Sequence, residues 1–397
     1  MPLSGWDARA GALVAMTSDL VRLPSQGGID PPDAVLAYLE RWLGAHRLRP
    51  HLIRDGGAAV GITCDVESGR PGPRYVLDCC VDTAPFGNAG KWRASPTSGD
   101  VVDGWLYGRG ASDSKSGIAV FCHVAAAIGG RREELRGTLT LLFDADEHTG
   151  GFRGAKRFFA DDAVRERGVD GVMIGYPGLH EVVTASRGFL RATVTVHGTA
   201  GHSGAIDREA WRDSAVEKAA RLAVRLREST LPAGRAPGFD LPPALTVTAI
   251  AGGESWTVVP DTCAIKVDMR LTPAFDAGAA RRVMAEAVAD VDASWPTVRP
   301  TSVEFLETWP AYALPDTSAV AGALVDAAAR HGVSVRRAAV GASNIGNYLA
   351  AHGVEATAGF GAPFRGLHGV DECVDASALP LVAAVYEDAV AVLLARG

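Results

Sequence analysis

The sequence predicts a two-domain α/β protein, with a mixed, mostly parallel sheet in a catalytic domain and a smaller α+β domain inserted into it. Three observations predict this fold class. The first third of the chain alternates short apolar runs with apolar helical stretches, as a sheet covered on both faces requires. Near Gly188 the pattern changes to the alternation of strands that bury one face. At 397 residues, the chain exceeds what one hydrophobic core usually organises.

The elements of the catalytic domain follow in order. Pro31-Pro32 opens a helix that runs through Trp42 with apolar residues at helical spacing. Short apolar runs predict buried strands, and a stretch that is apolar nearly all round and ends at Gly129 predicts a buried helix. The strands are expected at 75–81, 138–143 and 171–174, the buried helix at 116–128, and two later helices at 317–330 and 378–394.

The inserted domain is expected over residues 188–305, so that residues 1–187 and 306–397 form the catalytic domain. Its order is β-α-β-β-α, with strands at 189–196, 245–250 and 263–271 and helices at 207–227 and 279–291. This order predicts a small, ferredoxin-like antiparallel sheet with both helices on one face. Such a sheet leaves an open edge strand, and an open edge favours pairing with a second copy of the chain.

Composition excludes several classes of protein. Hydrophobic residues make up 47% and charged residues 21%, as in an ordinary globular chain. The net charge of −7 without a Lys/Arg run makes nucleic acid and anionic membranes unexpected partners. No run approaches about 18 uninterrupted apolar residues, and the first residues lack a secretory signal, so neither a spanning helix nor export is expected. Six scattered cysteines indicate reduced thiols, and we expect a cytoplasmic protein.

Four polar clusters lie where predicted strands or helices meet loops, the edge at which open α/β sheets bind ligands. They are Cys80-Val81-Asp82, Asp113 in the glycine-rich segment 106–117, Asp144-Ala145-Asp146-Glu147-His148, and the loop residue His368. Taken singly, three have ordinary structural explanations: a buried thiol with a turn aspartate, a helix N-cap at Asp113, and a structural histidine. The cluster at residues 144–148 has no such explanation, because its three acidic side chains repel one another unless a cation is bound.

Together the clusters resemble the M20 family of metallopeptidases and aminoacylases. The order matches along nearly the whole chain, through Gly108-Arg109-Gly110, Gly175-Tyr176-Pro177 and the final His368-Gly369. In the inserted domain, residues 196–204 resemble the family segment that carries a functional histidine, here His202. The resemblance implies a homodimer formed through the inserted domain, hydrolysis of an N-acyl amino acid or short peptide, and two zinc ions bridged by one carboxylate, matched by Asp113.

Three of the ligand positions implied by the resemblance are changed in this chain. Cys80 stands where the family has the histidine of its His-x-Asp motif, and His148 stands where it has the second glutamate of Glu-Glu. Tyr176 stands where the family has the acid of Gly-Glu/Asp-Pro. Asp113, His148 and His368 still make an ordinary three-ligand zinc set with room for a water. A neutral phenol is a poor ligand, and Cys80 alone cannot replace a full set. We therefore expect one zinc ion per chain, with a second site around Cys80 and Tyr176 that is weak or vacant.

The resemblance also assigns the other roles. Glu147 matches the general base, His202 the residue that reaches the partner subunit's site to stabilise the oxyanion, and Arg187 and Arg270 the groups that hold a substrate carboxylate. Asp82 matches the residue that orients the family's zinc-binding histidine, which is absent here. The leading hypothesis is zinc-dependent hydrolysis of an N-acyl amino acid or short peptide.

Two other functions remain open on the sequence. Cys80 is positioned to act as a thiolate nucleophile, which would give a non-hydrolytic acyl transfer or cyclisation. Alternatively, the chain is a catalytically inactive family member that retains the fold and the dimer interface. The metal content separates these hypotheses, since about one zinc per chain favours hydrolysis.

Overall fold

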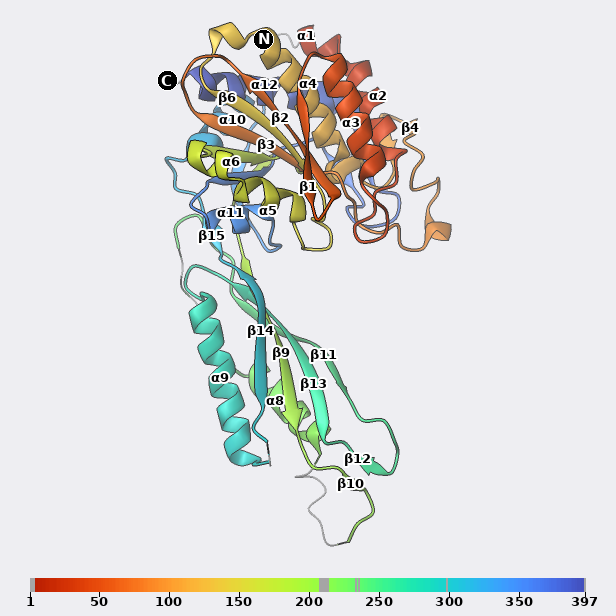
Figure 1. The fold of residues 1–397 in the computed structure, drawn as a ribbon, viewed down its shortest axis with the longest axis vertical. Helices are drawn as coiled ribbons and strands as arrows, with labels where there is room; N and C mark the ends of the chain where they lie inside the picture. The colour runs from red at the N-terminus through yellow and green to blue at the C-terminus, as the bar shows by residue number, and fades with distance from the viewer. Residues whose placement is uncertain (1–3, 207–213, 233, 235, 298, 396–397) are drawn as a thin grey trace. The chain divides into compact units, whose positions relative to one another are not determined.

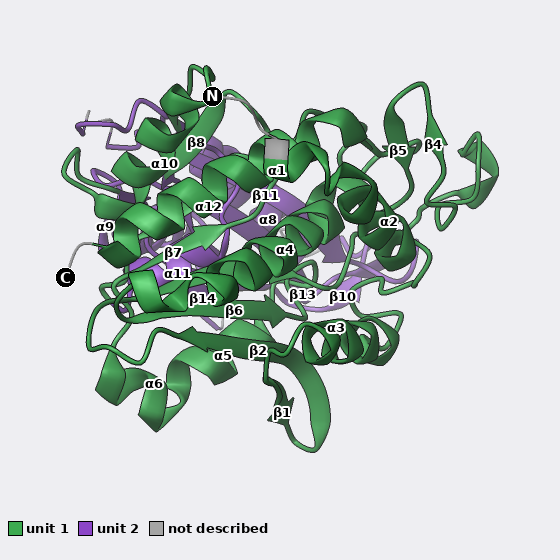
Figure 2. Ribbon diagram, turned by 90° about the horizontal axis from the view of Figure 1, so that it is seen from above, with its two compact units in different colours: residues 1–184, 314–338, 353–397 green, residues 185–313, 339–352 purple. Residues whose placement is uncertain are grey.

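The structure is a computed structural model that describes residues 4–206, 214–232, 234, 236–297 and 299–395. The chain forms two compact units, drawn in different colours in Figure 2. Unit 1 contains residues 1–184, 314–338 and 353–397, and unit 2 contains residues 185–313 and 339–352. Each unit has its own cluster of buried hydrophobic side chains.

Unit 1 is built on a mixed sheet with the strand order β1-β2-β6-β3-β7-β17-β8 (Figure 1). The bounds are β1 Pro50–Asp55, β2 Ala58–Glu67, β3 Arg74–Cys80, β6 Thr138–Asp144, β7 Gly171–Ile174, β8 Glu181–Ser186 and β17 Ala356–Gly359, and β16 (Arg336–Val340) also pairs with β8. The central strands β6, β3, β7 and β17 run parallel to one another. β2 pairs antiparallel with β6, β8 with β17, and β1 with β2. Every residue of β3 and β6 is buried, which explains why both strands are mainly apolar.

Helices cover both faces of this sheet. Leu139, Leu141 and Phe143 of β6 belong to one core with the helices α2 Ala10–Val21, α3 Asp33–Ala45, α4 Ser116–Gly130, α10 Ala319–Arg330 and α12 Leu379–Ala395. Near-continuous apolar sequence lets α4 sit between α2, α12 and the sheet. The opposite face carries α5 (Arg153–Ala160), followed by α6 (Asp162–Arg167), as Figure 2 shows.

Short elements complete unit 1. A second small sheet has the order β18-β19-β5-β4, with β4 at Val101–Val102, β5 at Trp105–Tyr107, β18 at Phe364–Arg365 and β19 at Cys373–Asp375. It joins the loop before Asp113 to the loop that carries His368, because β5 and β19 pair directly. The remaining turns are α1 (Ser4–Asp7), η1 (Ala89–Lys91), η2 (Ala111–Lys115), η3 (Arg132–Glu134) and η4 (Ala376–Ala378).

Unit 2 is an antiparallel sheet, in the order β11-β13-β9-β14, whose buried face packs against two helices. The bounds are β9 Gly188–His197, β11 Ala244–Gly252, β13 Thr262–Leu271, β14 Ser302–Trp309, α8 Ala215–Arg227 and α9 Ala277–Ser294. The side chains of Ser214 and Asp276 cap the two helices by accepting backbone N–H groups. Two short pairs, β10 (Gly201–His202) with β12 (Val258–Val259) and β15 (Tyr312–Ala313) with the end of β8, complete the unit with α11 (Ile345–Ala350).

The division of the chain into two units differs from the expected boundaries. Residues 185–187, 306–313 and 339–352, expected in the catalytic domain, group with unit 2. The reason is local: the Asn347 side chain donates to the carbonyls of Arg187 and Pro310, at 3.2 and 2.8 Å. The helix expected over 207–227 is described from Ala215, and residues 207–213 lie outside the described residues.

The C-terminal helix is long and apolar enough to be compared with a membrane span, although Glu387 and Asp388 interrupt its apolar sequence. Residues Ala376–Ala395 meet the criterion for such a span by length and composition, with a mean hydropathy of 1.8. However, 67% of this stretch is buried against the rest of the chain, and core helices pass the same test.

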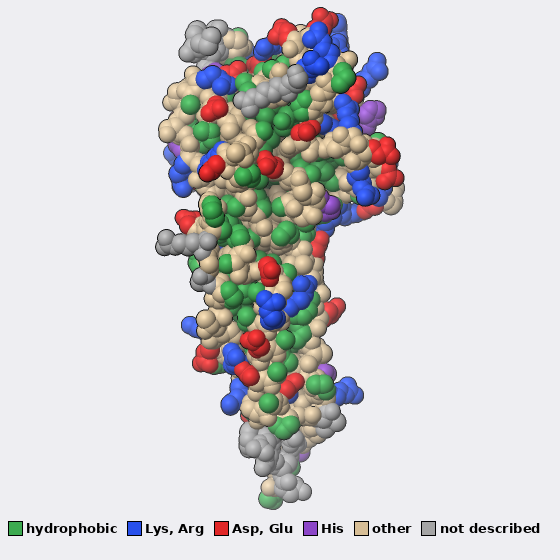
Figure 3. Space-filling model, turned by 90° about the vertical axis from the view of Figure 1, so that its left-hand side faces the viewer, with side chains coloured by type: hydrophobic (Ala, Val, Ile, Leu, Met, Phe, Trp, Pro, Cys, Tyr) green, Lys and Arg blue, Asp and Glu red, His purple; other side chains and the backbone are tan. Residues whose placement is uncertain are grey.

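On the face drawn in Figure 3, acidic and basic side chains are interspersed rather than gathered into a patch of one sign.

Candidate metal centre

The site begins with two neighbouring parallel strands that end side by side. Cys80, the last residue of β3, pairs with Asp144, the last residue of β6. The loops that follow these strands therefore emerge together, one carrying Asp82 and the other carrying Glu147 and His148. This is the carboxyl edge of the parallel strands, where side chains from different strands converge.

Asp113 lies at the centre of the predicted ligand set. Its Oδ2 is 2.9 Å from His368 Nε2 and 3.6 Å from His148 Nε2. Asp113 is buried, and its Oδ1 has no hydrogen-bond partner among the described residues. Burial alone would raise the pKa of Asp113, but the two histidines lower it to about 2. The three side chains predicted to hold zinc are therefore adjacent.

This donor set fits a zinc ion. One carboxylate oxygen and two imidazole nitrogens lie within 4.8 Å of one another. Ligand atoms around a tetrahedral zinc ion with bonds of about 2.0–2.1 Å are separated by roughly 3.3 Å, close to the two distances measured from Asp113. A second group of three atoms within 4.8 Å comes from Cys80, Glu147 and His148, so His148 belongs to both groups.

Asp82 has a role that the sequence did not indicate. Its two carboxylate oxygens accept the backbone N–H groups of Glu147 and His148, at 3.1 and 3.0 Å. The Nδ1 of His148 also lies 3.5 Å from Asp82. Although desolvation opposes protonation of His148, the carboxylates of Asp113 and Asp82 raise its pKa to about 10. Asp82 thus fixes the backbone of Glu147 and His148, and its carboxylate lies beside the His148 ring without a hydrogen bond to Nδ1.

Glu147 is half-buried beside the predicted ligand set and contacts Tyr176. The Tyr176 hydroxyl donates a hydrogen bond to Glu147 Oε1. Burial and the neighbouring Asp113 carboxylate raise the pKa of Glu147 to about 7, the range suited to a general base. Burial and the negative charge of Glu147 also hold the pKa of the Tyr176 phenol well above its usual value, so the phenol is neutral. Tyr176 therefore acts as a hydrogen-bond donor here.

Cys80 is a buried thiol. Its Sγ lies 3.3 Å from the hydroxyl oxygen of Ser114. Burial, together with the carboxylates of Glu147 and Asp113, raises the pKa of the Cys80 thiol well above its usual value. A nucleophilic cysteine needs the opposite environment, with nearby positive charge that favours the thiolate. The site gives no support to a Cys80 nucleophile.

Sequence reasoning gave no role to two residues that lie in this centre. Arg109 and Glu372 form a buried ion pair at 2.6 Å, next to the backbone of Asp113. Both residues lie inside the motifs that carry the predicted ligands. An arginine and a glutamate more than 250 positions apart give no indication in the sequence that they form a buried ion pair. Only the folded chain brings them together.

Three predicted residues lie in unit 2. His202 is on β10 and is exposed, and its Nδ1 accepts the N–H of Gly204 at 3.0 Å. The Arg187 guanidinium donates to the carbonyls of Gly341 and Pro242. Arg270 pairs with the Asp268 carboxylate at 2.8 Å. The two arginines are therefore engaged within unit 2, while His202 presents its ring at the surface.

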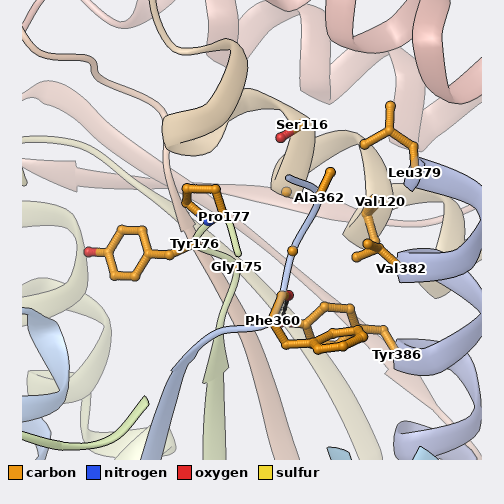
Figure 4. Close-up of a pocket in the computed structure, with 12 residues that line it drawn as sticks. Ser116, Val120, Gly175, Tyr176, Pro177, Phe360, Ala362, Leu379, Val382 and Tyr386 are labelled. Carbon is orange, nitrogen blue, oxygen red and sulfur yellow. Dashed lines mark hydrogen bonds between the residues drawn. The ribbon is translucent and has the colours of Figure 1, made fainter. Parts of the chain in front are cut away.

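A small cavity lies behind Tyr176 and is drawn in Figure 4. Its walls are mainly apolar and include Val120, Phe360, Val382 and Tyr386, and its volume is about 10 Å³. The ring of Tyr176 points away from the other labelled side chains, with its hydroxyl on the far side. A cavity of this size holds no more than about one water molecule, so it is not a substrate pocket.

Comparison with known proteins places this geometry in context. Residues 81–392 match peptidase family M20/M25/M40. The succinyl-diaminopimelate desuccinylase of Parvibaculum lavamentivorans is 30% identical over 264 residues, 64% of each chain. The enzyme of that name from Rhodospirillum centenum is 28% identical over 320 residues, 78% of this chain and 80% of the relative.

Solved structures share the fold over the whole chain. Aminopeptidase PepT from Bacillus cereus has a TM-score of 0.76 at 18% identity, covering 98% of this chain and 99% of that chain. The YXEP protein of Bacillus subtilis, described as a dinuclear metal-binding peptidase of the M20 family, has a TM-score of 0.74 at 16% identity, with coverage of 98% and 99%.

Proposed function

This chain belongs to peptidase family M20/M25/M40 and is a hydrolase of the amidohydrolase and peptidase class, and from this premise we propose that it hydrolyses the amide bond of an N-acyl amino acid or short peptide with a single zinc ion. The observation that carries the proposal is the convergence of His148 and His368 on the buried carboxylate of Asp113. That carboxylate keeps one oxygen without a partner among the described residues.

In this proposal Asp113, His148 and His368 hold the zinc ion. A bound zinc ion supplies Lewis acidity toward the scissile carbonyl. The Tyr176 hydroxyl donates its proton in a hydrogen bond to Glu147, and a phenol is a poor zinc ligand, which supports a single ion. A second ion around Cys80 would bind weakly.

Glu147 takes a proton from the attacking water. Its raised pKa suits that transfer near neutral pH. The hydrogen bond from Tyr176 holds one carboxylate oxygen of Glu147 in a fixed position. Asp82 fixes the backbone on which Glu147 and His148 stand, so the base and the ligand keep one relative position.

The substrate and the assembly are further parts of the proposal. The named relatives support an acylated amino acid as substrate, with Arg187 or Arg270 holding its carboxylate. The chain works as a cytoplasmic homodimer in which His202 of one subunit stabilises the oxyanion in the partner's site. The edge strand β11 supports pairing between copies, since six of its nine residues are exposed in one chain and none is buried.

The test combines metal counting with a substrate panel. The purified protein is dialysed against zinc, its metal content is measured by elemental analysis, and release of free amine is followed for N-succinyl and N-acetyl amino acids and dipeptides. We expect about one zinc per chain and hydrolysis that a chelator abolishes. Two ions of similar affinity would contradict the single-zinc assignment. Hydrolysis without any metal, lost in Cys80→Ser, would instead favour the thiolate reaction.

A further inference from the structure

We propose that Arg109 and Glu372 are positioning residues of the metal centre, whose buried ion pair sets the distance between Asp113 and His368. This inference rests on the proposed function, because it assigns a role toward the zinc ion. Neither residue is among the predicted ligands or bases, and neither touches the reacting atoms in this assignment.

Glu372 anchors the loop that carries Asp113. A single oxygen, Oε1, accepts the backbone N–H groups of Gly110, Ser112 and Asp113, at 3.1, 3.1 and 3.3 Å, and also the Ser112 hydroxyl at 2.8 Å. Converging N–H groups of this kind form a nest for a negative charge. The carboxylate of Glu372 therefore determines the path of the backbone up to Asp113 itself.

Arg109 connects this loop to His368. Its Nη1 donates to Glu372 Oε2 at 2.6 Å, and its Nη2 donates to the backbone carbonyl of His368 at 3.2 Å. The side chain of His368 is 53% exposed and stands in a loop, so packing does little to hold its ring. The bond from Arg109 to its carbonyl is thus a main restraint on where this ligand stands.

The burial of the pair indicates why it is a positioning device. The side chains of Arg109 and Glu372 are 2% and 1% exposed. Burying two charges gains little net stability, because their desolvation offsets their attraction. The pair instead fixes the geometry of the two loops, because separating the loops would leave an unpaired buried charge. In this fixed arrangement His368 Nε2 lies 2.9 Å from Asp113 Oδ2.

The experiment measures zinc affinity without substrate, by competition with a chromophoric chelator, for wild type and Glu372→Gln. Gln keeps the size of the side chain but removes the charge that faces Arg109. We expect the affinity to fall by about 10- to 100-fold, as for other residues that orient metal ligands. The visible spectrum of the cobalt-loaded variant should also change, because it reports the coordination geometry. Glu387→Gln is the matched control, because Glu387 pairs with Arg131, which follows the last residue of α4, whereas Asp113 precedes the first. Its zinc affinity should equal that of wild type.

A double variant separates position from stability. Arg109→Met with Glu372→Gln removes both buried charges, and the Gln amide oxygen can still accept the N–H groups of Gly110, Ser112 and Asp113. We expect it to fold, judged by circular dichroism, and still to bind zinc at least about tenfold more weakly than wild type. Wild-type affinity in the double variant, or in a folded Glu372→Gln protein, would overturn the inference. A wild-type chain that binds no zinc would overturn the proposed function, and this inference with it.

Discussion

Asp82 Oδ2 accepts the backbone N–H of His148 at 3.0 Å, across the two loops that follow β3 and β6. The second oxygen of the same carboxylate holds the N–H of Glu147. The sequence suggested that Asp82 had lost its partner, because the histidine two residues earlier is Cys80. In the folded chain the carboxylate serves the neighbouring loop instead, and it orients the histidine that replaces the usual glutamate ligand.

The first prediction concerns this bond. Asp82→Asn retains one oxygen acceptor but loses the charge beside His148, so the 147–148 backbone and the ring become less fixed. We expect zinc affinity to fall by about 10- to 100-fold, measured by chelator competition. Asp55→Asn, which alters an exposed carboxylate paired with Arg153, is the control and should leave the affinity unchanged. Equal affinities in both variants would remove the orienting role of Asp82.

The ligand assignment predicts opposite results for two neighbouring changes. His148→Ala removes a ligand and should abolish zinc binding, a greater loss than the roughly 100-fold expected from removing a residue that only orients a ligand. Tyr176→Phe removes only the hydroxyl that donates to Glu147 and should leave zinc binding nearly intact. Elemental analysis after gel filtration measures both. Loss of zinc in Tyr176→Phe would show that the phenol is a ligand after all.

The general base is tested by Glu147→Gln. The amide has nearly the same shape but takes no proton from water, so kcat should fall by about 10²- to 10⁴-fold. Zinc content should stay at the wild-type value, because Glu147 is not a ligand in the proposed site. A Glu147→Gln protein that loses zinc would place Glu147 in the metal site with Cys80 and His148.

The role of His202 in the partner subunit predicts complementation. Glu147→Gln and His202→Ala should each be nearly inactive as homodimers. Mixing equal amounts after dissociation gives heterodimers with one intact site, formed by Glu147 of one subunit and His202 of the other. The mixture should recover about a quarter of wild-type activity, from random pairing of two kinds of subunit. Failure to recover activity in proven heterodimers would exclude the trans role, and a monomer by light scattering would exclude the dimer.

A pH-dependent stability change is predicted at His123, away from the metal centre. Its ring packs against Trp42, and its Nε2 has no partner among the described residues. Burial, with the nearby His46 and Arg9, lowers the pKa of His123 to about 4. Because the unfolded chain binds a proton near pH 6.5 and the folded chain does not, this group destabilises the fold as the pH falls below 6.5.

His123 is only half-buried, so solvent screening reduces its effect to about 1 kcal/mol of unfolding free energy between pH 7 and pH 5. His123→Phe should therefore lose about 1 kcal/mol less stability than wild type over that interval. Urea unfolding followed by tryptophan fluorescence at both pH values measures the difference. His51→Phe, at an exposed histidine, serves as the control. Identical pH dependence in wild type and His123→Phe would contradict the prediction.

Much of the fold followed from local pattern. The runs expected at 75–81, 138–143 and 171–174 correspond to β3, β6 and β7, because a buried parallel strand needs uninterrupted apolar residues. The change of pattern near Gly188 corresponds to the start of β9, where buried and more exposed residues alternate. The fold class and the family were therefore predictable, whereas residues 339–352 joined unit 2 through contacts of Asn347 that no local pattern encodes.

For the site, the sequence by itself determined which residue types are available: a carboxylate at 113, imidazoles at 148 and 368, and an acid at 147. Their roles as ligands and base remain proposals. Tertiary structure alone decided the partners of each group, since Asp82 faces His148, Tyr176 donates to Glu147, and Glu372 pairs with Arg109. The physical reason is that spacing along a chain fixes which residues share a strand or a loop. The register of β3 against β6 and the pairing of β5 with β19 fix which loops meet, and burial then sets the charge that each group carries.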